Sequence, residues 1–118
     1  MKIRIKGNSI RYRLTKGDVE TFSENGYIEE RANFGNQTLI YALQQYGNDS
    51  LSANFEDNKI TLYMPAIMAN EWWLTNRVGF EHRENESFLL IEKDFKCLDN
   101  VAEDQSDNYP NPLALNMK

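Results

Sequence analysis

Basic residues alternate with apolar residues near the start of the chain, and they are the residues best suited to bind a ligand. Residues 2–6 and 10–14 both follow the two-residue period of a half-buried strand, so the cations of each strand should share one face. Arginine and lysine side chains that converge on one side of a sheet can bind phosphate or carboxylate groups. The cations expected on this face are Lys2, Arg4, Lys6, Arg11 and Arg13.

Two other interpretations of these cations stay open. Alternating charges also form the solvent-exposed face of an edge strand, where lysine discourages aggregation through strand pairing. Alternatively, the cations could pair with the chain's own acidic segment, residues 99–107.

Two adjacent tryptophans, Trp72 and Trp73, are the second candidate for a binding surface. Neighbouring side chains on a helix point about 100° apart, so both indoles cannot face the same core. An exposed tryptophan often marks a contact surface. The alternative is that the C-terminal segment covers one of them.

Other reactive residue types give weak signals. His82 and Cys97 could form a nucleophilic pair, but nothing in the sequence brings them together. His82 reads as a partly buried strand residue and Cys97 as a buried, inert thiol. The acidic C-terminal segment does not have the spacing of an EF-hand loop, and a run of charge is usually solvated. We therefore expect no metal and no cofactor. The acids of this segment are Asp99, Glu103, Asp104 and Asp107.

Composition bounds the class of protein. The chain has 118 residues, the size of one domain, and a net charge of −5, which argues against general nucleic-acid binding. It has one cysteine, no apolar run after its basic start and no stretch long enough for a membrane helix. These features predict a cytoplasmic protein that does not bind membranes, either a monomer or a homodimer.

The elements that would position these residues are short. Turn residues such as Gly35-Asn36 and Asp57-Asn58 separate alternating segments, which is typical of antiparallel hairpins. Thr15 and Asp18 form a variant capping box before a helix, and Gly26 fits the end of that helix. The expected strands are 2–6, 10–14, 27–34, 37–45, 51–56, 59–64, 78–83 and 88–93, and the expected helices are about 15–25 and 65–75.

These elements predict an α+β fold. We expect seven or eight short strands in an antiparallel, strongly curled sheet or small open barrel, with the two helices on one face or at one end. Side chains of the second helix expected on its buried side are Ile67, Met68, Trp72 and Leu74. The whole chain should form a single domain, with 99–118 as an acidic loop and an extended C-terminal arm. No internal repeat is visible in the sequence.

Three segments resemble a family of small uncharacterised bacterial proteins. They are 1–14, which contains both basic strands, 90–98 and 103–112. The family has no assigned activity, so the resemblance implies no catalytic residue. It implies that the C-terminal segment is a regular part of the domain. At the level of fold alone, the alternating charges are similar to those of antiparallel tunnel enzymes that hydrolyse triphosphates, although the order of motifs differs.

Two functions follow from these observations. The first is a non-enzymatic binding domain whose contact surface combines the basic strands with Trp72 and Trp73, and whose partner is a protein or a small anionic ligand. The second is an enzyme acting on phosphate esters or nucleotides, in which Arg4, Arg11 and Arg13 bind phosphate. In that case Glu29, Glu30 or Glu81 would hold Mg²⁺. The enzyme requires these side chains to converge in one pocket, whereas the binding domain needs only an exposed surface.

Overall fold

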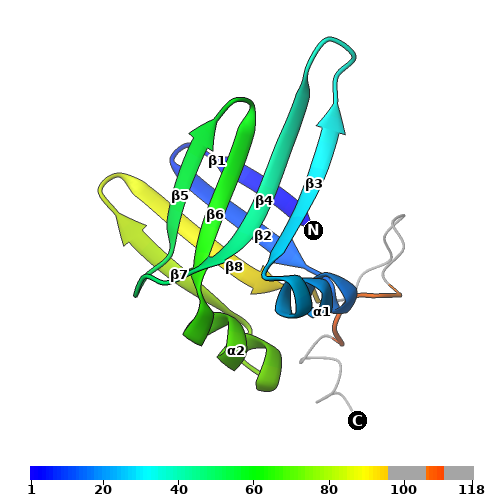
Figure 1. Ribbon diagram of the computed structural model, residues 1–118, viewed down its shortest axis with the longest axis vertical. Helices are drawn as coiled ribbons and strands as arrows, with labels where there is room; N and C mark the ends of the chain where they lie inside the picture. Colours follow the sequence, from blue (N-terminus) through cyan, green and yellow to red (C-terminus); the bar gives the residue numbers. More distant parts are fainter. Residues whose placement is uncertain (96–105, 111–118) are drawn as a thin grey trace.

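Two helices and eight strands make up the fold of the part of the chain that the structure describes (Figure 1). The computed structural model describes residues 1–95 and 106–110. The elements are β1 (Lys2–Lys6), β2 (Ser9–Leu14), α1 (Lys16–Asn25), β3 (Tyr27–Asn33), β4 (Thr38–Tyr46), β5 (Ser52–Glu56), β6 (Lys59–Pro65), α2 (Ala66–Leu74), β7 (Gly79–Glu84) and β8 (Ser87–Lys93). The α+β class predicted from the sequence is confirmed.

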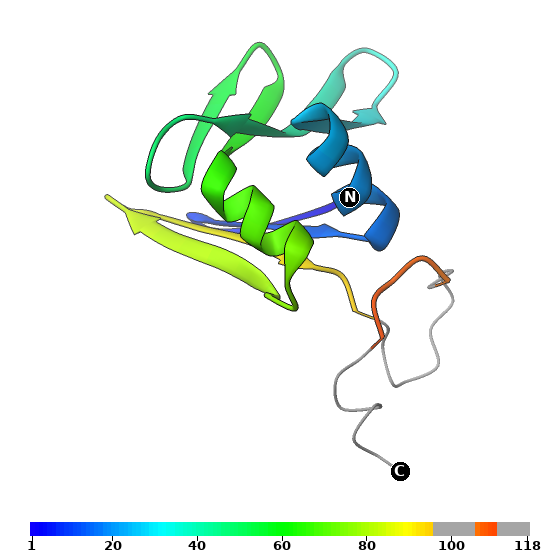
Figure 2. The same ribbon diagram turned by 60° about the horizontal axis from the view of Figure 1, so that its bottom comes forward.

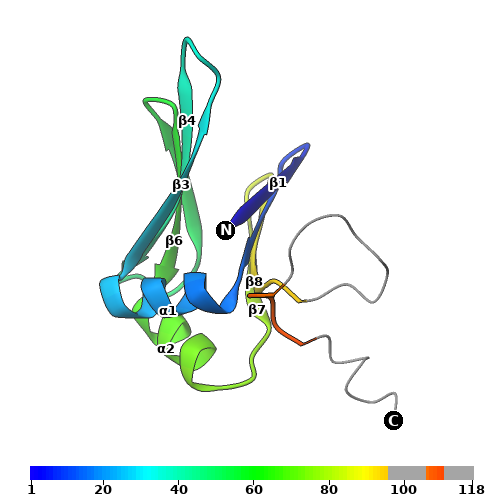
Figure 3. The same cartoon turned by 90° about the vertical axis from the view of Figure 1, so that its right-hand side faces the viewer.

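The strands form two four-stranded sheets. Sheet A has the order β1-β2-β8-β7, and sheet B has the order β3-β4-β6-β5. Figure 3 shows the two sheets face to face, with the helices between them at one end and the hairpin tips diverging at the other. The expected single curled sheet or small barrel is therefore corrected to two open sheets. The central pairs, β2 with β8 and β4 with β6, are parallel rather than antiparallel.

The two halves of the chain have the same order of elements. Each half consists of a hairpin, a helix and a second hairpin, and the second half begins at β5. Sheet A combines the first hairpin of the first half with the second hairpin of the second half, and sheet B combines the other two hairpins. Exchanging the halves converts one sheet order into the other. The structure thus contains a repeat that is not visible in the sequence.

The turns set the register within each hairpin. Asp57 and Asn58 have φ values of 51° and 62°, so both central residues of this tight turn are left-handed, as in a type I′ turn. The turn at Asp57-Asn58, predicted from the sequence, pairs Phe55 with Ile60 and Glu56 with Lys59. In the β3–β4 hairpin Ala32 pairs with Leu39.

Helix α1 begins and ends as its sequence predicts. The Thr15 side chain accepts a hydrogen bond from the backbone of Asp18, and the Asp18 side chain accepts one from the backbone of Thr15. Gly26 ends the helix in the left-handed conformation, with φ 69°. Val19 and Phe22 lie one helical turn apart and are buried against the sheets.

Helix α2 buries a narrower stripe than predicted. Ala69 and Trp72 are buried, whereas Ile67 is 77% exposed and Leu74 is 76% exposed. The expectation that Ile67 and Leu74 face the core is wrong. The helix is short and lies across one end of the molecule (Figure 2). Only Ala69 and Trp72, at positions i and i+3, contact the core, and the flanking apolar side chains are exposed to solvent.

The core lies between the two sheets at the end that the helices close. Tyr12 on β2 is completely buried, and its hydroxyl donates a hydrogen bond of 3.2 Å to the backbone oxygen of Ile60 on β6. This bond links the two sheets directly. At the opposite end the inner faces separate and leave an apolar cleft of about 460 Å³. Its lining includes Ile5, Ile10, Leu39, Phe55 and Ile60.

Candidate functional site

Strand register places the five N-terminal cations on one face of sheet A. Lys2 pairs with Arg13 and Arg4 pairs with Arg11, across β1 and β2. Tyr12 and Leu14, which alternate with the arginines of β2, are buried in the core between the sheets. The cations therefore point away from sheet B. We call this surface the basic face, and its residues are Lys2, Arg4, Lys6, Arg11 and Arg13.

Acids at the end of β8 neutralise part of the basic face. The Arg11 guanidinium donates a hydrogen bond of 2.5 Å to Glu92, which lies on the neighbouring strand. Asp94 is 2% exposed and lies 3.0 Å from the Lys2 ammonium and 4.0 Å from Arg13. Because a buried carboxylate needs compensating charge, these two cations contribute to the stability of the fold.

Arg4 and Lys6 differ from the other three cations. Both are exposed, and within residues 1–95 and 106–110 neither has an ion-pair partner. Arg4 lies directly opposite Arg11, and like charges on directly opposite residues destabilise a strand pair. A shallow hollow of about 200 Å³ lies between them, with Lys6 and Ser9 at its sides and Leu90 also lining it. An anion in this hollow would remove the repulsion.

The two tryptophans have different environments. Trp72 is fully buried, donates a hydrogen bond of 2.9 Å to the backbone oxygen of Val78 and packs edge-to-face on Phe22. Trp73 is 45% exposed and lies beside the inner end of β8, not on the basic face. The structure therefore does not join the tryptophans and the five cations into one continuous surface.

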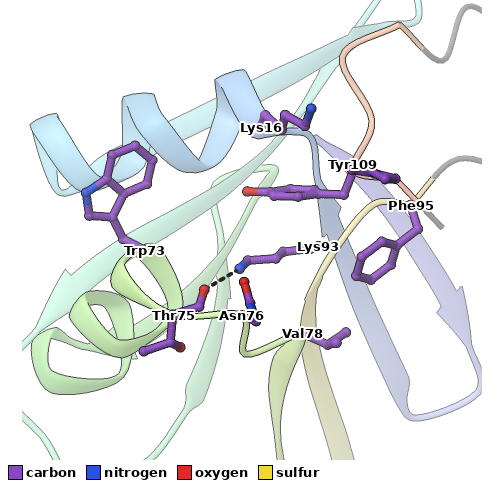
Figure 4. A pocket seen from close by; sticks show the side chains of 9 residues that line it. Lys16, Trp73, Thr75, Asn76, Val78, Lys93, Phe95 and Tyr109 are labelled. Atoms are coloured by element: carbon purple, nitrogen blue, oxygen red, sulfur yellow. Dashed lines mark hydrogen bonds between the residues drawn. The ribbon is translucent and has the colours of Figure 1, made fainter. Parts of the chain in front are cut away.

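Trp73 lines a cavity with a volume of about 700 Å³ (Figure 4). This cavity, which we call the Lys93 pocket, lies between the end of α2, the start of α1, the end of β8 and residues 109–110. Its lining residues are Lys16, Trp73, Thr75, Asn76, Val78, Lys93, Phe95, Tyr109 and Pro110.

Lys93 is the central polar residue of this pocket, and it was not predicted from the sequence as a site residue. It is 7% exposed, and its ammonium donates a hydrogen bond of 3.0 Å to the backbone oxygen of Thr75. The ammonium also lies 5.2 Å from the centre of the Tyr109 ring. Burial lowers the pKa of Lys93. The sequence did contain a signal: Lys93 follows Leu89 and Ile91 at the two-residue spacing of a strand, so it lies on the same core-facing side of β8.

The short segment 106–110 is held against the end of the sheet. The backbone nitrogen of Tyr109 donates a hydrogen bond of 2.8 Å to the backbone carbonyl oxygen of Asp94, and the Tyr109 ring packs on Phe95. Asp107 accepts hydrogen bonds from the first backbone nitrogens of α1, those of Lys16 and Gly17. Asp107 therefore caps a helix rather than pairing with the basic strands. The other candidate acids, Asp99, Glu103 and Asp104, and the thiol of Cys97 lie outside the described residues.

A comparison with protein-family models gives one match over residues 1–113, to a family of unknown function (DUF7009). The chain belongs to the DUF7009 family. The match includes the segment 106–110, so the residues of the helix cap and of the aromatic contact described above lie within the matched region. No match was found among the curated proteins or the solved structures.

The carboxylates proposed as metal ligands are dispersed in this DUF7009 domain. Glu29 lies on sheet B, where it accepts hydrogen bonds from Tyr27 and Arg31. Glu30 accepts a hydrogen bond of 3.3 Å from the Met1 amine. Glu81 is on β7 of sheet A, where it pairs with Leu90. Leu90 in turn pairs with Arg11, and Arg11 with Arg4, so these four residues lie in one line across the strands. Among the described residues, no group of three or more His, Cys, Asp or Glu side chains is arranged to hold a metal, and no helix could span a membrane.

Proposed function

We propose that this DUF7009 domain is a non-enzymatic binding domain whose basic face holds an acidic segment of a partner protein. The observation that supports it is the uncompensated charge on β1. Arg4 lies opposite Arg11, Lys6 follows on the same face, and no described acid pairs with Arg4 or Lys6. A carboxylate-rich segment would supply the missing charge.

The shape of the basic face favours an extended partner over an enclosed small molecule. The hollow beside Arg4 is only about 200 Å³, whereas typical small-molecule sites are roughly 300–1,000 Å³. A second shallow hollow, beside Glu81 and Glu92, continues across the same face and also includes Leu90. A peptide lying across the strands could place carboxylates near β1 and an apolar side chain on Leu90.

Charge and composition support the rest of the proposal. A net charge of −5 disfavours nucleic acid as the polyanion, because the repulsion acts over the whole molecule. The single cysteine suits a reducing environment, so we place the domain in the bacterial cytoplasm as a monomer or homodimer.

The alternative, an enzyme acting on phosphate esters or nucleotides, receives less support from the geometry. Glu29 and Glu30 belong to the other sheet, and Glu81 is two strands from Arg11, which corresponds to about 10 Å at the usual strand spacing. The arginines and these acids do not share a pocket.

Binding of a fluorescent polyglutamate peptide, followed by anisotropy, tests the proposal. The double variant Arg4→Gln/Lys6→Gln should bind at least about tenfold more weakly, because two charge-assisted contacts are lost. Arg31→Gln is the matched control, since Arg31 is an exposed arginine on sheet B. Binding should also weaken as salt rises.

Two results would contradict the proposal. One is equal affinity of the double variant and the wild type for the peptide. The other is stabilisation by a nucleotide with Mg²⁺ but not by polyglutamate in a thermal-shift assay, where a ligand at 100 times its Kd should add about 2.7 kcal/mol. The second result would favour the enzyme.

A further inference from the structure

The Lys93 ammonium is buried without a described carboxylate partner. It is 7% exposed, and no Asp or Glu among residues 1–95 and 106–110 lies within ion-pair distance of it. An ammonium group has three donors, and the structure shows one of them bonded, to the Thr75 oxygen. Buried charges are normally paired, so this group has capacity for an anion.

The cavity around Lys93 has the size and lining of a small-molecule site. Its volume of about 700 Å³ falls within the usual range of roughly 300–1,000 Å³ for such sites. Most of its wall is apolar, with Trp73 on one side and Val78 and Phe95 on the other. Figure 4 shows the Lys93 ammonium and the Tyr109 hydroxyl directed into the same space, with the Asn76 amide oxygen beside the ammonium and the Trp73 indole across from them.

The balance of charge and apolar surface defines the ligand. One buried ammonium can neutralise one carboxylate, whereas a phosphate ester carries more charge and is usually held by several donors or an arginine fork. The hydroxyl of Tyr109 can donate a hydrogen bond to the same carboxylate. The aromatic walls then suit an apolar or aromatic body attached to it.

We propose that the Lys93 pocket binds a small monocarboxylic acid with an apolar or aromatic body, its carboxylate on Lys93 and its body against Trp73. This site is separate from the basic face, and it does not depend on the function proposed for that face. Lys93 also donates a hydrogen bond to the backbone oxygen of Thr75, the C-terminal cap residue of α2. The competing explanation is that Lys93 only stabilises the end of this helix, and the experiment must distinguish that role from ligand binding.

Titration of the full chain with phenylacetate, followed by calorimetry and thermal shift, tests this site. Phenylacetamide is the matched neutral probe, since it has the same body without the charge. We expect phenylacetate to bind and to stabilise the protein, and phenylacetamide to bind at least about tenfold more weakly, as expected for loss of a buried charge pair. Arg4→Gln/Lys6→Gln should bind phenylacetate as the wild type does, which distinguishes this pocket from the basic face.

Lys93→Gln keeps a donor for the Thr75 oxygen and removes the charge, so a structural role alone would leave phenylacetate binding intact. We expect at least about a tenfold loss of affinity in this variant. Trp73→Ala changes only the apolar wall of the pocket, and it provides a second test if Lys93→Gln does not fold. This variant should bind phenylacetate at least about threefold more weakly, and it should bind acetate as tightly as the wild type does. The proposal is overturned if phenylacetate gives no heat or thermal shift, or if the folded variants bind it as tightly as the wild type.

Discussion

One buried hydroxyl links the two sheets of this domain directly. The ring of Tyr12 is fully buried, and its hydroxyl donates a hydrogen bond to the backbone of the opposite sheet. The sequence predicted the phase of β2, and hence that Tyr12 faces the core. It could not predict the partner of the hydroxyl, which lies 48 residues away on β6.

Tyr12→Phe removes only that hydroxyl. The Ile60 oxygen loses one of its donors, so we expect the free energy of unfolding to fall by about 0.5–1.5 kcal/mol. Urea denaturation gives this value directly. Tyr63→Phe, on the outer face of sheet B, is the control. A stability equal to that of the wild type would show that the bond between the sheets does not contribute.

Tyr109 makes the free energy of unfolding depend on pH in the alkaline range. Burial, aided by the charges of Asp107 and Asp18, raises the pKa of Tyr109 to about 12. A phenol whose pKa is higher in the folded state keeps its proton there and loses it more readily when unfolded. Its contribution is fully present below about pH 10, the pKa of an unfolded tyrosine, and is lost as the pH rises toward 12.

Tyr109→Phe should therefore lose less stability than the wild type between these two pH values. Denaturation midpoints measured across this range test the expectation. Phe95→Leu disturbs the same ring contact without removing a titrating group, so its pH dependence should match the wild type. An identical slope for Tyr109→Phe and wild type would contradict the assignment.

Individual elements were largely predictable, and their contacts were not. Capping residues and turn residues act over a few positions, so α1 and the β5–β6 register could be predicted from Thr15, Asp18, Asp57 and Asn58. The parallel pairing of β2 with β8 joins residues about 80 positions apart, and no local pattern encodes it. The exposed face of α2 was mispredicted for the same reason, because periodicity does not reveal how little surface the sheets leave for that helix.

The start of α1 receives two caps, one local and one distant. Thr15 binds the nitrogen of Asp18, and Asp107 binds the nitrogen of Gly17 from the other end of the chain. Asp107→Ala should lower the free energy of unfolding by about 0.5–1 kcal/mol, because an acid near a helix N-terminus also favours the helix dipole. Asp107→Asn, which keeps the acceptor, should recover part of the loss. Chemical denaturation of both variants decides this, and an Asp107→Ala protein as stable as wild type would contradict it.

The whole molecule depends on exchange between its two halves. Each half supplies one hairpin to each sheet, so neither half contains a complete sheet. The Lys93 pocket is also built at this scale, from α1, α2, β8 and residues 109–110. For that reason Trp73 was a candidate from the sequence, but its approach to Lys93 and Tyr109 was not predictable.

Fragments 1–48 and 49–118, produced separately, should each be unfolded, because a hairpin alone is at best marginally stable in water. Mixed together, they should regain the β-sheet circular dichroism and the buried-tryptophan fluorescence of the intact chain. A folded fragment 1–48 on its own would contradict the dependence of each half on the other.

The exchanged hairpins also bear on how such a domain can originate. Two identical hairpin–helix–hairpin chains joined by a twofold axis would form both sheets with the same neighbours seen here. Duplication and fusion of one short gene would make that dimer a single chain without creating any new interface. Once fused, the copies are free to diverge, which is how one sheet could acquire the cations of β1 and β2 while the equivalent strands of the other, β5 and β6, keep only Lys59.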